Sequence, residues 1–295
     1  MQKYLVLAFG VVCVAFAAVF IKLADAPPLV IAAYRLCLAS MVLAPVAWWR
    51  AREELRRLRR RQVLLAIASG AFLALHFGLW VASLDYTTVA SSVVLVTASP
   101  IFVAIASYLI WREKMTARIV DGIAVSVIGA VVIGLGNWRA GAGSLLGSGL
   151  ALGGAMAVAG YLLIGRRLRQ SLGLLSYIFL TYFSAAVLLL AAALVSGQRL
   201  TGYSGTTYMM FVLLALVPQL LGHSSLNWAL RFVPATMVTI AVLGEPVGAT
   251  LLAFFILKEV PAWIEIAGGV LILAGIAVAF TTPRQATTQI PNSKL

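Results

Sequence analysis

A few polar side chains interrupt the long apolar segments of this chain, and Glu245 is the most unusual of them. It lies near the middle of the apolar segment 234–256, and Pro246 follows it directly. An ionised carboxylate far from water is costly unless it faces a cavity or a partner. Two roles fit this position. Glu245 either lines a cavity, as the partner of an ammonium group or as a proton carrier, or it caps the helical turn that Pro246 disrupts.

The chain has two histidines, His76 and His223, and both lie well inside apolar segments. Histidine titrates near neutral pH and can shuttle protons, whereas a buried neutral histidine hydrogen-bonded between helices is the structural alternative. Trp80 and Asn227 follow the two histidines by four residues, which places each pair on one helix face. The spacing therefore predicts two similar faces, each with a histidine and a second side chain that can recognise a solute.

Other polar residues could add contacts to the same solute. Thr97, Ser99, Gln219 and Ser224 can supply neutral hydrogen bonds. Arg35 lies inside the apolar segment 27–49, where it either extends toward the membrane surface or pairs with a carboxylate. It could instead attract an anionic group of the substrate.

The composition shows which elements must hold these residues. Hydrophobic residues make up 62% of the chain, charged residues 11%, and the mean hydropathy is +1.03. A chain of this composition needs lipid as its solvent, because one soluble core would leave large apolar surfaces in water. Apolar segments long enough to cross a bilayer as helices recur ten times. They lie near 4–22, 27–49, 63–84, 88–110, 117–136, 145–165, 172–195, 207–229, 234–256 and 261–281.

The two halves of the chain are copies of each other. Ser99-Pro100 matches Glu245-Pro246 at an offset of 146, and Glu113 matches Glu259 at the same offset. Gly122 matches Gly268, Gly129 matches Gly275 and Arg112 matches Lys258. Because each copy holds five spans, the second copy must be inverted in the membrane, which is typical of secondary transporters. Paired prolines at matching positions predict broken helices around a substrate site, with Pro100 and Pro246 as candidate hinges.

This repeat predicts the domain organisation of an all-α integral membrane protein. We expect a first repeat over 1–136, an extracytoplasmic loop over 137–144, a second repeat over 145–281 and a cytoplasmic tail over 282–295. A cleaved signal peptide is not expected, because its removal would leave the first repeat without its first helix.

The basic residues predict the topology. The net charge is +13, and seven arginines lie between Arg50 and Arg61, in the loop after the second span. With the N-terminus in the cytoplasm, 17 of the 22 lysines and arginines fall on the cytoplasmic side. We therefore expect a multi-pass protein of the inner membrane with both termini cytoplasmic, and we do not expect nucleic acid as a partner.

Enzymatic chemistry is not expected. Cys13 and Cys37 lie inside spans, and the sequence has no metal-spaced His/Cys cluster, no acid pair and no nucleophile motif. We predict no catalytic residues, no metal and no cofactor.

The chain resembles the drug/metabolite transporter superfamily, and within it the ten-helix permeases built from two EamA repeats. The resemblance rests on Val94–Ala104, Trp111–Lys114, Asn227–Thr236 and Leu243–Glu259. It implies a central cavity enclosed by the first, third, fourth, sixth, eighth and ninth helices. The residues eligible to face substrate are then His76, Trp80, Ser99, His223, Asn227 and Glu245.

Among ten-helix members, the chain is similar to the YddG-type exporters of aromatic amino acids. The first span has no acidic residue before Asp25, unlike the four-helix multidrug members, which carry a glutamate there. We therefore expect a carrier that exports amino acids or similar small metabolites by alternating access. An exporter of organic cations, drugs or other metabolites is the main alternative, and a membrane scaffold is a remote one. Proton coupling and facilitation without ion coupling both stay open.

Overall fold

A computed structural model describes residues 2–111, 117–233 and 235–280 of the protein, and in this part of the chain all regular structure is helical. The first half contains α1 (Gln2–Ala15), α2 (Ala17–Leu23), α3 (Pro28–Arg50), α4 (Arg52–Arg56), α5 (Arg60–Ser83), α6 (Val89–Val96), α7 (Ser99–Trp111) and α8 (Ala117–Ala140). The second half contains α9 (Ala142–Leu168), α10 (Leu174–Val195), α11 (Gly205–Leu214), η1 (Ala215–His223), α12 (Ser224–Ala229), α13 (Ala235–Val242), α14 (Glu245–Leu252), η2 (Ala253–Leu257) and α15 (Trp263–Phe280).

The helices account for every predicted span. Within the described residues, seven helical segments are long and apolar enough to cross a membrane. Three shorter apolar helices, Val120–Gly136, Glu245–Leu257 and Trp263–Gly275, fall in the remaining predicted spans. The protein is therefore an all-α membrane protein. The predicted tail over 282–295, together with Arg112 and Glu113 of the repeat, lies outside the described residues.

Two spans break at the matching prolines. α6 ends at Val96 and α7 begins with Ser99-Pro100, while α13 ends at Val242 and α14 begins with Glu245-Pro246. Proline lacks a backbone N–H and is therefore tolerated in the first turn of a new helix. A further proline, Pro218, lies within the wide-turn helix η1, although the sequence analysis did not single it out.

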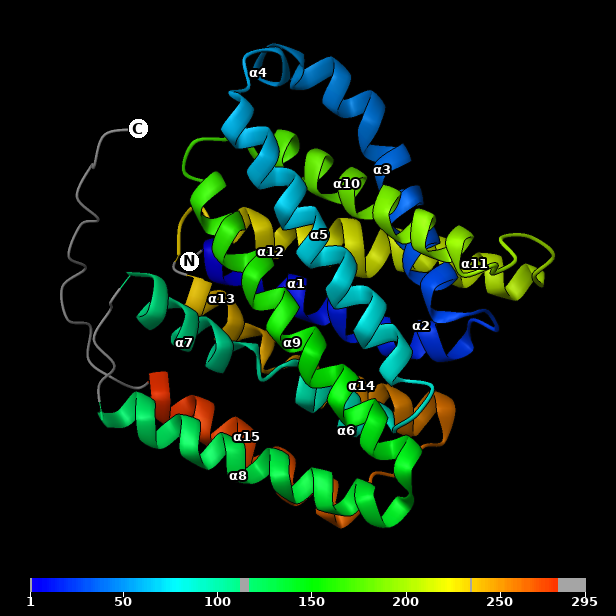
Figure 1. The fold of residues 1–295 in the computed structure, drawn as a ribbon, viewed down its shortest axis with the longest axis vertical. Helices are drawn as coiled ribbons and strands as arrows, with labels where there is room; N and C mark the ends of the chain where they lie inside the picture. The colour runs from blue at the N-terminus through cyan, green and yellow to red at the C-terminus, as the bar shows by residue number, and fades with distance from the viewer. Residues whose placement is uncertain (1, 112–116, 234, 281–295) are drawn as a thin grey trace.

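Six spans form the centre of the molecule, and two helix pairs flank them (Figure 1). α3 packs against α10 on one side, and α8 packs against α15 on the other. In the centre, α5 packs along α9, and α1 packs along η1 and α12.

Glycines bring α8 and α15 into close contact. A Cβ atom added to Gly129 would lie 2.6 Å from the carbonyl oxygen of Gly268. A Cβ atom added to Gly275 would likewise lie 2.6 Å from the carbonyl oxygen of Gly122. Small residues of this kind let membrane helices approach until their backbones touch. The two contacts are equivalent in the repeat, because Gly129 matches Gly275 and Gly122 matches Gly268 at the offset of 146.

A single hydrogen bond marks the centre of that symmetric contact. The Ser126 hydroxyl donates to the carbonyl oxygen of Ile272 over 3.2 Å, and these residues are separated by 146 positions. A residue that contacts its own repeat mate must lie near the axis that relates the two halves. The approximate twofold axis of the inverted repeat therefore passes between α8 and α15 at this point.

The connection between the halves is shorter than the expected loop over 137–144. α8 continues to Ala140 and α9 begins at Ala142, so Gly141 alone joins them. Gly141 has a φ of 118°, a backbone conformation that favours glycine because it has no Cβ atom. One such residue reverses the chain direction, so the flanking polar residues are incorporated into helices.

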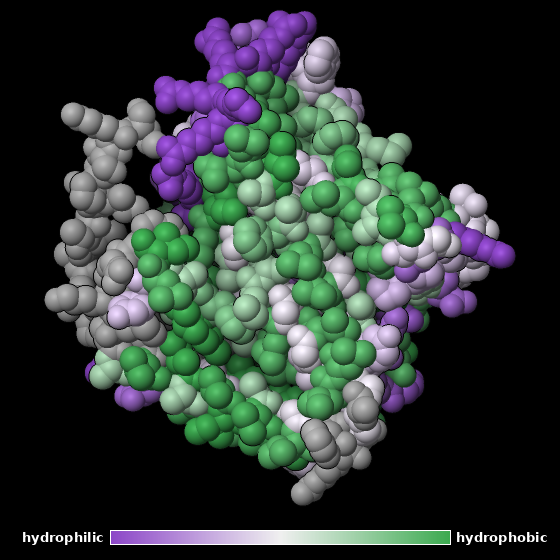
Figure 2. Space-filling view, in the orientation of Figure 1, coloured by the Kyte–Doolittle hydropathy of each residue, from purple (hydrophilic) through white to green (hydrophobic). Residues whose placement is uncertain are grey.

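The surface matches a bilayer environment. Apolar side chains cover the middle of the visible face, and hydrophilic side chains gather around α4 (Figure 2). The seven arginines from Arg50 to Arg61 are all exposed there, and Trp48 and Trp49 beside them are exposed as well. This is the arrangement expected of a charged loop and an aromatic belt at the edge of a membrane.

We predict that Gly129→Ala destabilises the protein by about 1–3 kcal/mol, because the new methyl group would overlap a backbone oxygen of α15. Gly134→Ala in the same helix is the control, since a Cβ atom there has no neighbour within 4 Å. The measurement is the thermal unfolding midpoint of the purified protein in detergent. Equal midpoints for the two variants would show that the close contact between α8 and α15 is not formed.

Candidate functional site

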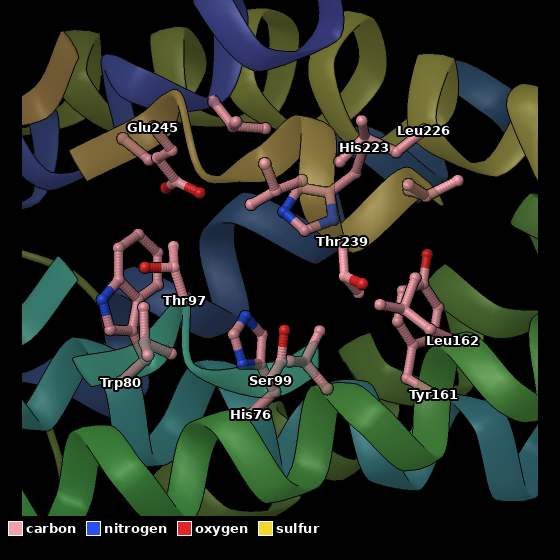
Figure 3. Close-up of a pocket in the computed structure, with 16 residues that line it drawn as sticks. His76, Trp80, Thr97, Ser99, Tyr161, Leu162, His223, Leu226, Thr239 and Glu245 are labelled. Atoms are coloured by element: carbon pink, nitrogen blue, oxygen red, sulfur yellow. The ribbon is translucent and has the colours of Figure 1, made fainter. Parts of the chain in front are cut away.

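A cavity lies between the central helices, and about 620 Å³ of space within it and at its opening is not filled by protein atoms (Figure 3). Its walls come from α1 and α2, α5, α6 and α7, α9, η1 and α12, and α13 and α14, which are the six spans that the resemblance implied. The lining residues are Val14, Ala17, His76, Trp80, Val96, Thr97, Ser99, Val158, Tyr161, Leu162, His223, Leu226, Val238, Thr239, Val242 and Glu245.

Five of the six predicted substrate-facing residues line this cavity, namely His76, Trp80, Ser99, His223 and Glu245. Figure 3 shows the Glu245 carboxylate pointing into the cavity at the end where Trp80 and Thr97 lie. His223 lies on the same wall as Glu245, whereas His76 and Ser99 lie on the opposite wall. The broken helices thus contribute Ser99 from one half and Glu245 from the other.

His76 is held between a backbone carbonyl and an aromatic ring. Its Nδ1 lies 3.0 Å from the carbonyl oxygen of Gly154 on α9. Because a carbonyl oxygen only accepts hydrogen bonds, this contact places a proton on Nδ1 and leaves Nε2 for other partners. The imidazole also stacks on Trp80, with ring centroids 5.9 Å apart and planes 11° apart. The four-residue spacing along α5 therefore builds one continuous recognition surface.

Arg35 lies close to the cavity but does not line it. Its side chain is fully buried, so it does not extend toward the membrane surface. Its Nε donates to Oε1 of Gln219 over 2.8 Å, and its guanidinium carbon lies 4.0 Å from the centre of the Phe77 ring. The Phe77 ring in turn meets the His223 ring edge-on, with centroids 5.3 Å apart. Within the described residues, Arg35 also forms no ion pair with a carboxylate, which was the other role expected from the sequence. The ion pair found in this part of the chain is between Arg57 and Glu53.

Asn227 differs from the other predicted residues because it supports the wall from behind. The Tyr161 hydroxyl donates to its Oδ1 over 2.7 Å, and its Nδ2 donates to the Tyr182 hydroxyl over 3.1 Å. Asn227 is fully buried and does not line the cavity. Two tyrosines satisfy both ends of its amide, so the side chain holds the Tyr161 ring in place at the cavity surface.

Three features of the site were not predicted from the sequence. Thr239 lines the cavity, and the only sequence feature that indicates it is a hydroxyl inside an apolar span. Tyr161 forms part of the wall, whereas an aromatic residue within a span more often packs the bundle than lines a pathway. Arg169 was counted as a charge of a cytoplasmic loop but is buried. Its Nε donates to the carbonyl oxygen of Asn227 over 3.1 Å, and its Nη1 donates to that of Leu172.

The cavity combines one carboxylate, two imidazoles, several hydroxyls and a large apolar surface. A few polar groups on an apolar wall are typical of sites that bind a small solute reversibly. Hydrogen-bonding groups come from both halves of the repeat, so a bound solute would contact both at once.

We predict that Asn227→Leu destabilises the protein by about 1–3 kcal/mol, because it leaves the buried Tyr161 and Tyr182 hydroxyls without their amide partner. Tyr161→Phe should cost less, because Asn227 keeps its bond to Tyr182. Thermal unfolding in detergent gives the order, with Ser225→Ala on the same helix as the control. A loss for Asn227→Leu no larger than that for Ser225→Ala would contradict the assignment.

Comparison with known proteins gives two relatives that are both described as uncharacterized transporters. YdfC of Bacillus subtilis is 24% identical over 188 residues, which is 63% of this chain and 60% of YdfC. A transporter of Archaeoglobus fulgidus is 23% identical over 289 residues, which is 96% of this chain and 98% of the relative. The chain thus matches less than two thirds of YdfC but almost all of the archaeal protein.

A solved crystal structure has the same fold, with a TM-score of 0.69 at 18% identity over 97% of this chain and 99% of that protein. The sequence model of the EamA-like transporter family matches twice, over residues 1–135 and 145–281. Both halves of the molecule, and therefore both walls of the cavity, are covered by this match. The chain belongs to the EamA-like transporter family.

Proposed function

We propose that this transporter exports amino acids, aromatic and other neutral ones among them, or closely related small metabolites. The observation that carries the proposal is the lining of the cavity. Glu245 offers a carboxylate to an ammonium group, while Trp80, His76 and Tyr161 offer ring surfaces to an apolar or aromatic side chain. Hydroxyls of Thr97, Ser99 and Thr239 add hydrogen-bonding capacity around the same space.

The way the two halves meet supports alternating access as the proposed mechanism. Each half contributes one broken span to the cavity, and the breaks at Pro100 and Pro246 supply irregular backbone where rigid segments can pivot. In inverted repeats of this kind, one half rocks against the other around a central site. We propose that residues 1–136 and 145–281 are these two moving units.

The proposed topology places both termini in the cytoplasm and the protein in the inner membrane. Its support is the exposed arginine loop around α4, since short loops rich in arginine are retained in the cytoplasm. The loop connecting α5 with α6 would then face the opposite side.

The test is flux from proteoliposomes loaded with labelled amino acids, with and without a pH gradient. We expect faster release of amino acids than from loaded liposomes that contain no protein. Acceleration of this release by the pH gradient would indicate proton coupling through Glu245 or the histidines. If another solute moves while no amino acid does, the amino-acid assignment is wrong. If no solute of a mixed panel moves, the scaffold alternative is favoured.

Export of organic cations is the second candidate, and Glu245 is the reason for considering it. Within the described part of the chain, its carboxylate faces the cavity without a hydrogen-bond partner. A cationic drug or amine could therefore occupy the same position as the ammonium group of an amino acid.

We predict that Glu245→Gln slows transport of amine-bearing solutes by roughly tenfold, because the amide keeps the shape but loses the charge-assisted contact. Solutes without an amine should be carried at close to the wild-type rate. Initial rates in proteoliposomes, normalised to reconstituted protein, give the comparison, with Gly134→Ala on α8, outside the cavity, as the control. Equal losses for amine-bearing and neutral solutes would assign Glu245 to the structure of the helix break.

A further inference from the structure

Arg35 is a buried cation whose hydrogen bonds are incomplete. Its Nε is bonded to Gln219, but Nη1 and Nη2 have no hydrogen-bond partner among the described residues, although the side chain is fully buried. Burying a charged group without partners costs several kcal/mol, and the loss is largest where no water can reach it. The folded protein therefore keeps an unfavourable group at its centre.

A second buried arginine shows how the same fold satisfies a guanidinium. Arg169 also has almost no exposure, but it donates to two backbone carbonyls, those of Asn227 and Leu172. Arg169 therefore stabilises the end of α9, whereas Arg35, within the described residues, makes one hydrogen bond and one ring contact and leaves two nitrogens unpartnered. The contrast indicates that Arg35 is retained for a partner other than the protein itself.

In the described part of the chain, two further buried side-chain nitrogens have no partner, and both are hydrogen-bond donors, whereas the other unpartnered atoms are the oxygens of Ser40, Thr87, Thr181 and Gln198. Nε2 of Gln219 and Nε1 of Trp80 are buried and have no acceptor among the described residues. Together with the two Arg35 nitrogens they form an excess of N–H groups, and Trp80 lines the cavity. Such a set matches a ligand group that only accepts hydrogen bonds, above all a carboxylate.

Arg35 lies next to the cavity although it does not line it. The charged groups and rings around it include Tyr182, Glu245 and Tyr161, and it also lies near His76 and His223. Tyr182 lies outside the cavity lining, and the other four residues line the cavity. The Phe77 ring stacks on the guanidinium and meets the ring of His223, which lines the cavity, edge-on. Because Arg35 does not line the cavity, contact between its two free nitrogens and a solute requires a rearrangement of the side chains around it.

We propose that Arg35, oriented by Gln219, is a carboxylate-binding residue of the substrate site, and that it acts opposite Glu245, which takes the ammonium group. The site then selects zwitterions, which carry both charges a short distance apart. Bidentate binding by Nη1 and Nη2 suits a planar carboxylate, and lysine does not reproduce this geometry. This inference rests on the proposed function and specifies its substrate class.

The first experiment uses the wild-type protein and ligands that differ in one group. Transport of labelled L-phenylalanine into proteoliposomes is competed with unlabelled L-phenylalanine, phenylalaninamide, phenethylamine and 3-phenylpropionate. The amide and the amine, which lack the carboxylate, should compete at least about tenfold more weakly than phenylalanine, as expected for the loss of a charge-assisted pair of hydrogen bonds. Equal competition by phenylalanine and its amide would overturn the inference.

The second experiment separates binding from folding. In the double variant Arg35→Met with Gln219→Leu, apolar groups replace both hydrogen-bonded partners, a change that is often neutral or stabilising. We predict an unfolding midpoint equal to or above that of the wild type, together with a loss of phenylalanine transport of roughly 10- to 100-fold. Arg169→Met is the matched control and should lower the midpoint. Lower stability of the double variant, or unchanged phenylalanine transport by it, would overturn the inference.

The two proposals fail in different ways. If the wild type moves phenethylamine but neither phenylalanine nor 3-phenylpropionate, both the amino-acid assignment and the carboxylate site are wrong. If it moves 3-phenylpropionate but no amino acid, the proposed function is wrong, and the carboxylate site stands if the double variant abolishes that transport. If it moves phenylalanine and its amide equally well, the proposed function stands and the role of Arg35 is refuted.

Discussion

A polar group inside a lipid-embedded helical bundle must find its partner within the protein, because the hydrocarbon around it offers no hydrogen bonds. Most of the buried polar groups described here obey this constraint. Asn227 is satisfied by Tyr161 and Tyr182, and Arg169 by backbone carbonyls at the end of α9. These contacts fix the cavity wall from behind, so the shape of the cavity depends on them.

Among the described residues, the buried side-chain nitrogens without a partner belong to three residues, whereas the unpartnered oxygens are those of Ser40, Thr87, Thr181 and Gln198. Arg35, Gln219 and Trp80 keep unpartnered nitrogens at or beside the cavity, and Glu245 presents its carboxylate to it. Unpaired buried polar groups cost stability, and the carboxylate site proposed for Arg35 would give the guanidinium nitrogens a partner. The cavity therefore differs from the surrounding core in its unused hydrogen-bonding capacity, because the core of the bundle is apolar and closely packed.

Symmetry and asymmetry have separate roles in this molecule. α8 and α15 meet through matching glycines, and Ser126 bonds to its own repeat mate, Ile272. The contact between α8 and α15 is therefore nearly symmetric, as expected where two repeats meet. The cavity is not symmetric, since Ser99 in one half stands where Glu245 stands in the other. Its two ends consequently offer different charges to a solute.

The sequence alone determined the membrane environment, the ten spans and the two helix breaks, because hydropathy, the offset of 146 and proline chemistry are local properties of the chain. It also indicated Glu245, His76 and Trp80, since a polar or aromatic side chain at a regular helical spacing is visible without coordinates. Only the tertiary structure decided which of these residues share a cavity, and it moved Asn227 behind the wall because two distant tyrosines satisfy its amide. The environment of Arg35 was hidden for the same reason. Its partner Gln219 lies 184 residues away, and the two free nitrogens are recognised only when every neighbour in space is known.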